Sequence, residues 1–200
     1  MYDFMCNRYL LKHKDLLKET TKDILYMDED MFNCGGFALG LDEWYLPYDD
    51  ELDERCDDVR DDYYPNDDEL CDDLANLYIE FMTREHDWIR EIFDESELKE
   101  NEYLVVFKAS IYDFHYARRL SNGQWYHKLG TQPVRPVSED RIYDDEWWYG
   151  MPCSYAGRLR FLAVKKLDMS VFRNNRRLRQ HTTPHYYFDK LSLNFRKEVA

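Results

Sequence analysis

The feature that most constrains the fold is a change of hydrophobic pattern near Asn101. Before it, apolar residues recur at spacings of three, four and seven from Asp68 to Phe93, which is typical of an amphipathic helix. After it, Tyr103 to Phe107 is a continuous apolar run that predicts a buried strand. Helices followed by strands indicate an α+β fold, with N-terminal helices packed on an antiparallel sheet.

A hairpin is the strongest local signal after that change. Ile111 to Leu120 and Gln124 to Leu129 are strand-like, and they flank Ser121-Asn122-Gly123. Asn-Gly between two such runs favours a tight turn. Leu159 to Val164 is a further strand candidate. These segments supply the sheet of the expected fold.

The first half of the chain is expected to carry two more helices and a loop. We expect helices from Arg8 to Tyr26 and from Cys34 to Leu41, the second beginning after Asn33, a favoured N-cap residue. The segment from Trp44 to Asp67 is expected to be a loop, because two prolines interrupt it and few apolar residues anchor it.

Charge is distributed unevenly along the 200 residues, whose net charge is -14. Acidic residues dominate from Asp42 to Asp73, and basic residues dominate from Arg158 onward. The simpler interpretation is two solvated surfaces that face each other; the sharper one is that the acidic stretch docks a basic partner. The acidic balance argues against direct nucleic-acid binding. We therefore predict a domain of residues 1–167 with an acidic insertion at about 42–68, and a basic C-terminal extension, residues 168–200, docked on it.

Several classes of protein are disfavoured by composition. No apolar run approaches the roughly 20 residues that span a bilayer, and no basic-then-apolar signal segment opens the chain. The five cysteines are widely spaced and show no spacing of a metal site. We expect a cytoplasmic protein with free thiols, no metal, no cofactor and no membrane contact; the sequence leaves its oligomeric state undefined.

Cys34 is the first candidate for chemistry. At the first turn of a helix, unpaired N–H groups and the helix dipole lower the pKa of a thiol, and the thiolate is a nucleophile. Gly35, which follows it, lacks a Cβ atom and would let a substrate backbone approach the sulfur. The N–H of Cys34 would serve as an oxyanion donor. The simpler interpretation of Cys34 is an inert buried thiol.

His115 is the candidate proton partner, since it lies within the predicted sheet and can face a helix-borne cysteine. His127, on the return strand of the hairpin, would orient it if the turn has three residues, because Ala117 then faces His127 and both histidines share a face. A two-residue turn places Arg118 opposite His127 and turns His127 away. Asp113 is another candidate orienter or substrate contact. Both histidines also have a purely structural interpretation.

Two blocks of residues resemble a known family. Asn33-Cys34-Gly35-Gly36-Phe37-Ala38-Leu39 is similar to the cysteine motif of small papain-like cysteine peptidases and amidases, including relatives of the NlpC/P60 and CHAP groups. The hairpin block from Asp113 to Gly130 resembles the histidine hairpin of some bacterial and phage members. The acidic insertion and the basic tail depart from that pattern.

The resemblance implies a papain-like fold and a cysteine hydrolase that cleaves an amide bond in a peptide, isopeptide or peptidoglycan-type substrate. Cys34 would be the nucleophile, His115 the base and His127 the orienting residue. Asn33, Gly35, Asp113 and Trp125 would contact the substrate or the oxyanion. The alternative is a non-enzymatic acidic protein on the same scaffold that binds a basic host protein, for example a phage-encoded inhibitor.

Overall fold

The computed structural model describes residues 33–41, 44–130 and 132–166. The helix predicted from Arg8 to Tyr26 and the basic extension of residues 168–200 lie outside the described residues. The elements follow in the order α2 (Cys34–Leu39), α3 (Asp50–Asp61), α4 (Asp67–Glu85), β1 (Ile89–Ile92), the short 3-10 helix η2 (Glu95–Glu97), β2 (Glu102–Ala109), β3 (Phe114–Arg119), β4 (Trp125–His127), β5 (Arg135–Val137), α5 (Glu139–Ile142), α6 (Asp145–Tyr149) and β6 (Arg160–Lys165).

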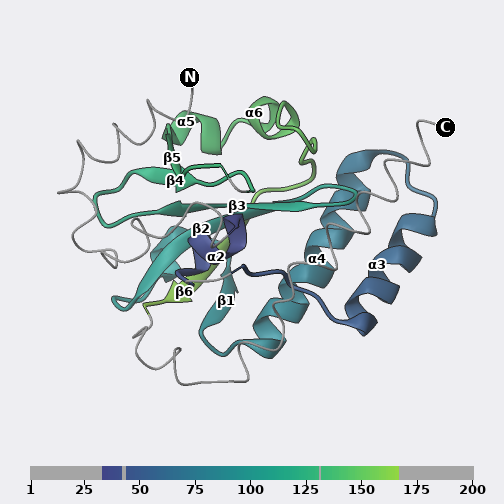
Figure 1. Cartoon of the computed structure of the whole chain (residues 1–200), viewed down its shortest axis with the longest axis horizontal. Helices are drawn as coiled ribbons and strands as arrows, with labels where there is room; N and C mark the ends of the chain where they lie inside the picture. Colours follow the sequence, from purple (N-terminus) through teal and green to yellow (C-terminus); the bar gives the residue numbers. More distant parts are fainter. Residues whose placement is uncertain (1–32, 42–43, 131, 167–200) are drawn as a thin grey trace.

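The described strands form one six-stranded sheet in the order β1-β6-β2-β3-β4-β5, with every neighbouring pair antiparallel (Figure 1). The expected α+β arrangement, helices first and an antiparallel sheet after, is therefore confirmed. The sheet is buried on both faces. Side chains alternate between the faces along a strand, so Phe107 and Tyr116 face the helices α2 and α4, while Val106 and Ala117 face the segment that carries α5 and α6.

The prediction of a loop from Trp44 to Asp67 is wrong for the middle half of this segment, because Asp50–Asp61 forms helix α3. Asp49 caps the helix by accepting a hydrogen bond from the N–H of Leu52 at 2.6 Å. Leu52 and Cys56, four residues apart, are buried and fix one face of α3 in the core. A few well-spaced apolar residues thus suffice to dock an otherwise acidic helix.

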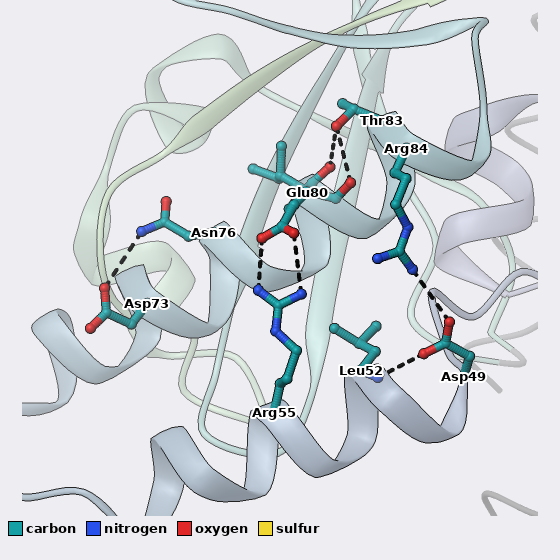
Figure 2. Close-up of polar contacts among 9 residues, drawn as sticks. Asp49, Leu52, Arg55, Asp73, Asn76, Glu80, Thr83 and Arg84 are labelled. Atoms are coloured by element: carbon teal, nitrogen blue, oxygen red, sulfur yellow. Dashed lines mark hydrogen bonds and ion pairs between the residues drawn. The ribbon is translucent and has the colours of Figure 1, made fainter.

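Helix α3 lies alongside α4, and Arg55 of α3 joins the two helices through an ion pair (Figure 2). Both terminal nitrogens of Arg55 donate to Glu80 of α4, at 3.2 and 2.8 Å. Arg84 reaches back from α4 to Asp49, the cap of α3, at 3.4 Å. The acidic segment is therefore part of the helical layer, and its exposed carboxylates lie on a rigid element.

One predicted helix is shorter than expected, and one strand of the sheet was not expected. The helix expected from Asp68 to Phe93 ends at Glu85, and the following Ile89–Ile92 is strand β1, paired with β6 at the edge of the sheet. The apolar residues of this stretch fit the repeat of a strand as well as that of a helix. Pairing with β6 favours the strand. Strand β5 was not predicted, because Arg135–Val137 is only three residues long and contains a proline.

Candidate functional site

Asn33 fixes the start of helix α2, as its predicted N-cap role requires. Its Oδ1 accepts hydrogen bonds from the N–H groups of Gly36 and Tyr45, at 2.9 and 3.0 Å. Its Nδ2 donates to the carbonyl oxygen of Tyr45 at 2.8 Å. One buried side chain therefore caps the helix and ties the segment around Tyr45 against it.

Cys34 lies at the first position of α2, and its side chain is buried. The thiol donates to the carbonyl oxygen of Phe114, with Sγ and O separated by 3.8 Å. Burial raises the pKa of the Cys34 thiol, with a smaller contribution from the charge of Asp113, and backbone N–H groups oppose this only in part. The predicted lowering of the pKa at the helix N-terminus is therefore wrong for this state, because desolvation outweighs the amides.

Gly35 serves packing in this structure. A Cβ atom on Gly35 would lie 2.7 Å from the carbonyl oxygen of Tyr45 and 3.4 Å from Cε2 of Tyr116. The space that was predicted to admit a substrate is thus taken by the chain itself. The glycine allows the Tyr45 segment and strand β3 to approach the helix together.

His115 and His127 form a hydrogen-bonded pair. Ala117 of β3 lies opposite His127 of β4, and the N–H of Leu120 donates to the carbonyl oxygen of Gln124, so the turn Ser121-Asn122-Gly123 has three residues. The register that was predicted to place both histidines on one face is confirmed. Nε2 of His115 lies 3.1 Å from Nδ1 of His127.

Both imidazoles are buried, and both are held neutral near pH 7. Burial lowers the pKa of His115 well below its ordinary value, and the nearby His127 lowers it further. Burial lowers the pKa of His127 to about 4, with a smaller contribution from Arg135. A neutral histidine can accept a proton, so the pair retains the capacity of a general base.

Cys34 and His115 reach a common pocket from opposite faces of the sheet. Phe114 and Tyr116 pack with Cys34 on the face that α2 covers, whereas His115 points to the other face, where Trp148 lies. Both side chains line a pocket of about 300 Å³ at the start of β3. Among the described residues no hydrogen bond joins Cys34 to His115; the thiol is bonded to Phe114 and the imidazole to His127.

The pocket wall is mostly apolar, with one carboxylate and two thiols. Its lining residues are Asn33, Cys34, Trp44, Leu46, Asp113, Phe114, His115, Leu129, Gly130, Gln132, Pro152, Cys153 and Tyr155. Of the sequence-predicted site residues, Asn33, Cys34, Asp113 and His115 therefore come together here. The apolar walls favour a substrate that presents an uncharged side chain.

Asp113 lines this pocket beside Tyr155. The phenol of Tyr155 donates to Oδ2 of Asp113 at 2.8 Å. Burial raises the pKa of Asp113, and the hydrogen bonds from Tyr155, Phe114 and Cys153 lower it in part. Asp113 therefore contacts Tyr155 and lies near Cys34, but it is not the residue that orients His115; that contact belongs to His127.

Trp125 lies away from the pocket. It is 1% exposed, in the core on the face of the sheet that α5 and α6 cover, and the guanidinium of Arg119 lies 5.6 Å from its ring centroid. Its predicted role as a substrate contact has no support in this geometry. Gly35 and Trp125 are thus the two predicted contacts that do not line the pocket.

The surroundings of the histidine pair include residues that sequence reasoning did not assign to the site. The ring centroid of Tyr155 lies 5.4 Å from that of His115, and the ring of Trp147 lies 5.3 Å from that of His127. Trp148, beside Trp147 on α6, is fully buried. Nothing in the sequence around Tyr155 and Cys153 indicates a site. They lie far along the chain from Cys34 and reach the pocket through the segment between α6 and β6.

Other kinds of site find no support in the part of the chain that is described. No group of three or more His, Cys, Asp or Glu residues there is placed to hold a metal ion. No helix within residues 33–41, 44–130 and 132–166 is long and apolar enough to cross a membrane. The candidate chemistry therefore rests on the side chains of the pocket.

Comparison with known proteins found no match to the chain, either among protein-family models or among curated sequences. The resemblance to papain-like peptidases accordingly stays a prediction from the residues.

Proposed function

We propose that this chain is a papain-like cysteine hydrolase that cleaves an amide bond in a peptide, isopeptide or peptidoglycan-type substrate. The observation that carries the proposal is the pocket onto which both the Cys34 thiol and the hydrogen-bonded His115 open. The order of the elements agrees with it: a helix-borne cysteine, then a histidine at the start of a strand, then a polar residue on the neighbouring strand.

The roles follow from the atoms available. His127 engages Nε2 of His115, so Nδ1 is the ring nitrogen that would serve Cys34. Sγ of Cys34 attacks the substrate carbonyl carbon while its proton passes to Nδ1 of His115. That proton then goes to the leaving nitrogen, and the C–N bond breaks to give a thioester. Water then attacks the thioester carbonyl carbon and gives a proton to His115; the C–S bond breaks to release the carboxylic acid, and the proton passes from His115 to Sγ, which restores the Cys34 thiol.

The resting pair in this proposal is neutral. Burial raises the pKa of the thiol and lowers the pKa of the imidazole, so proton transfer accompanies attack and no thiolate–imidazolium pair precedes it. The N–H of Cys34 remains the proposed oxyanion donor. Asp113, on the pocket wall, is the proposed substrate contact, and the proposed site of action is the cytoplasm, or that of the host if the chain is phage-encoded.

The test is turnover of a peptide and isopeptide library by the wild type and by Cys34→Ser and His115→Ala variants. Each substitution should lower turnover by a factor of about 100 to 10,000. Cys71→Ser is the matched control, because Cys71 is buried but does not line the pocket. Unchanged turnover in folded Cys34→Ser would overturn the proposal.

A second candidate function is favoured by the exposed acidic side of α3. Asp57, Asp58 and Asp61 are exposed, while Arg55 and Arg60 are engaged by Glu80 and Asp57. We propose as the alternative that this side binds a basic protein without catalysis. Binding of a lysine-rich peptide should then weaken steeply as salt rises and should be lost in the Asp58→Lys/Asp61→Lys variant. Salt-independent binding would contradict it.

A further inference from the structure

A buried lysine lies beside the histidine pair. Lys108 of β2 is directly opposite His115 of β3, so both side chains point to the same face of the sheet. The side chain of Lys108 is 1% exposed. A buried ammonium is costly unless it is paired, so its partner matters to everything around it.

That partner is at the first residue of α6. Nζ of Lys108 lies 2.6 Å from Oδ1 of Asp145, whose own side chain is 85% exposed. The ion pair therefore joins the middle layer of the molecule to a short surface helix. The exposed carboxylate of Asp145 can move away into solvent, whereas the buried side chain of Lys108 cannot easily move with it.

Helix α6 in turn covers the two histidines. The ring of Trp147 packs at 5.3 Å on His127, and the ring of Trp148 lies at 6.0 Å from His115. Nε1 of Trp148 donates to the carbonyl oxygen of Ile142 at 2.8 Å, which joins α6 to α5. With five residues, α6 is too short to be stable by itself, so its position depends on such contacts.

We propose that the Lys108–Asp145 ion pair is a positioning element that seats α6 over the His115–His127 pair and keeps water away from it. The proposal rests on the proposed function only in taking these histidines as the catalytic ones. Lys108 and Asp145 touch neither imidazole by hydrogen bond and act through the tryptophans of α6.

Loss of the Asp145 charge and loss of the cover that α6 provides have opposite effects on the pKa of His127, so a titration can tell them apart. The charged and titratable groups around the pair include Lys108 from β2, Asp113 just before β3, Arg135 from β5, Asp145 from α6 and Tyr155 from the loop before β6. Loss of the Asp145 charge by itself would lower the pKa of His127, since the cations would be less compensated. Loss of the cover admits water and raises that pKa toward its ordinary value, because burial is the main cause of its lowering.

The experiment is a nitrogen-detected NMR titration of both imidazoles in the full chain, comparing wild type with Asp145→Ala. We expect the proton affinity of His127 to rise about tenfold or more in the variant. Glu146→Ala is the matched control, since it removes the same charge from the same helix without a partner at Lys108, and it should leave the titration unchanged. Asp145→Glu should restore the wild-type titration.

An unchanged or lowered pKa of His127 in folded Asp145→Ala overturns the positioning role. The readout requires no substrate, so it is separate from a failure of the proposed function. If Cys34 is not a nucleophile, the titration still shows whether the ion pair positions α6. If the ion pair does not position α6, the turnover expected of the wild type stays the same.

Discussion

Nε2 of His115 lies 3.1 Å from Nδ1 of His127, across the neighbouring strands β3 and β4. A single proton is shared between two neutral imidazole nitrogens, so this contact selects a tautomer. If His115 donates from Nε2, its Nδ1 carries a lone pair and can accept a proton. The pair thus fits a base held in position by its neighbour, which is the relationship that the proposed chemistry requires.

The first prediction concerns stability against pH. The folded-state pKa of His127 is about 4 and that of His115 is also lowered, whereas an unfolded histidine has a value near 6.5. Below about pH 6.5 the unfolded chain binds protons that the folded chain does not. The free energy of unfolding should therefore have its full value above about pH 6.5. Below that pH it should fall by up to about 1.4 kcal/mol per pH unit for each histidine.

Urea unfolding between about pH 7 and about pH 5 measures this effect above the range where most carboxylates titrate. His127→Gln removes one of the two groups and should make the pH dependence shallower. An equal slope in wild type and variant would show that His127 is not held neutral by the fold.

The second prediction concerns Gly35. In Gly35→Ala the new methyl group would lie 2.7 Å from the carbonyl oxygen of Tyr45, a contact with backbone that cannot rotate away. We expect a loss of about 1–3 kcal/mol in the free energy of unfolding. A neutral Gly35→Ala would mean that the Tyr45 segment is not packed against α2.

The third prediction compares two arginine–carboxylate pairs that each have two hydrogen bonds but differ in burial. Arg90 donates to both carboxylate oxygens of Glu102, which is buried, and Arg55 does the same to the exposed Glu80. Arg90→Ala should cost about 3 kcal/mol, because it leaves a buried carboxylate without its charged partner. Arg55→Ala should have a much smaller effect on stability, because this pair is exposed to solvent. Thermal or urea unfolding measures both, and equal costs would contradict the difference in burial.

The fourth prediction concerns Tyr155 and Asp113. The Tyr155 hydroxyl donates to Oδ2 of Asp113 at 2.8 Å and lowers a carboxyl pKa that burial has raised. Tyr155→Phe should therefore raise the pKa of Asp113 further, measured by carboxyl-carbon NMR, so that its negative charge is lost at a higher pH. Tyr149→Phe, on an exposed tyrosine, is the control. A lowered pKa in Tyr155→Phe would show that the hydrogen bond does not favour the charged carboxylate.

The fold could be predicted where local signals agree with tertiary context. The run around Val105, the Asn-Gly turn and the N-cap at Asn33 each have a local physical cause, and each is confirmed. Helix α3 was missed because Leu52 and Cys56 are its only buried side chains, and the core residues on which they pack, such as those of α4 and β2, are distant in sequence.

The site was predictable only in part, for the same reason. The shared face of His115 and His127 follows from the turn length and strand pleat, which are local. Tyr155 and Trp147 come from other segments, and no sequence spacing places them. The raised thiol pKa of Cys34 was also out of reach, because it depends on burial that only the assembled pocket determines.

Site-resolved acylation tests the central claim most directly. The wild type and His115→Ala are treated with a small activated ester, and the acyl group on each cysteine is quantified by peptide mass spectrometry. We expect Cys34 to be acylated in the wild type and to lose most of this reactivity in His115→Ala, with exposed Cys153, in the same pocket, unchanged as the internal control. If Cys34 is not acylated in the folded wild type, or is acylated equally without His115, the pair is not a nucleophile and its base.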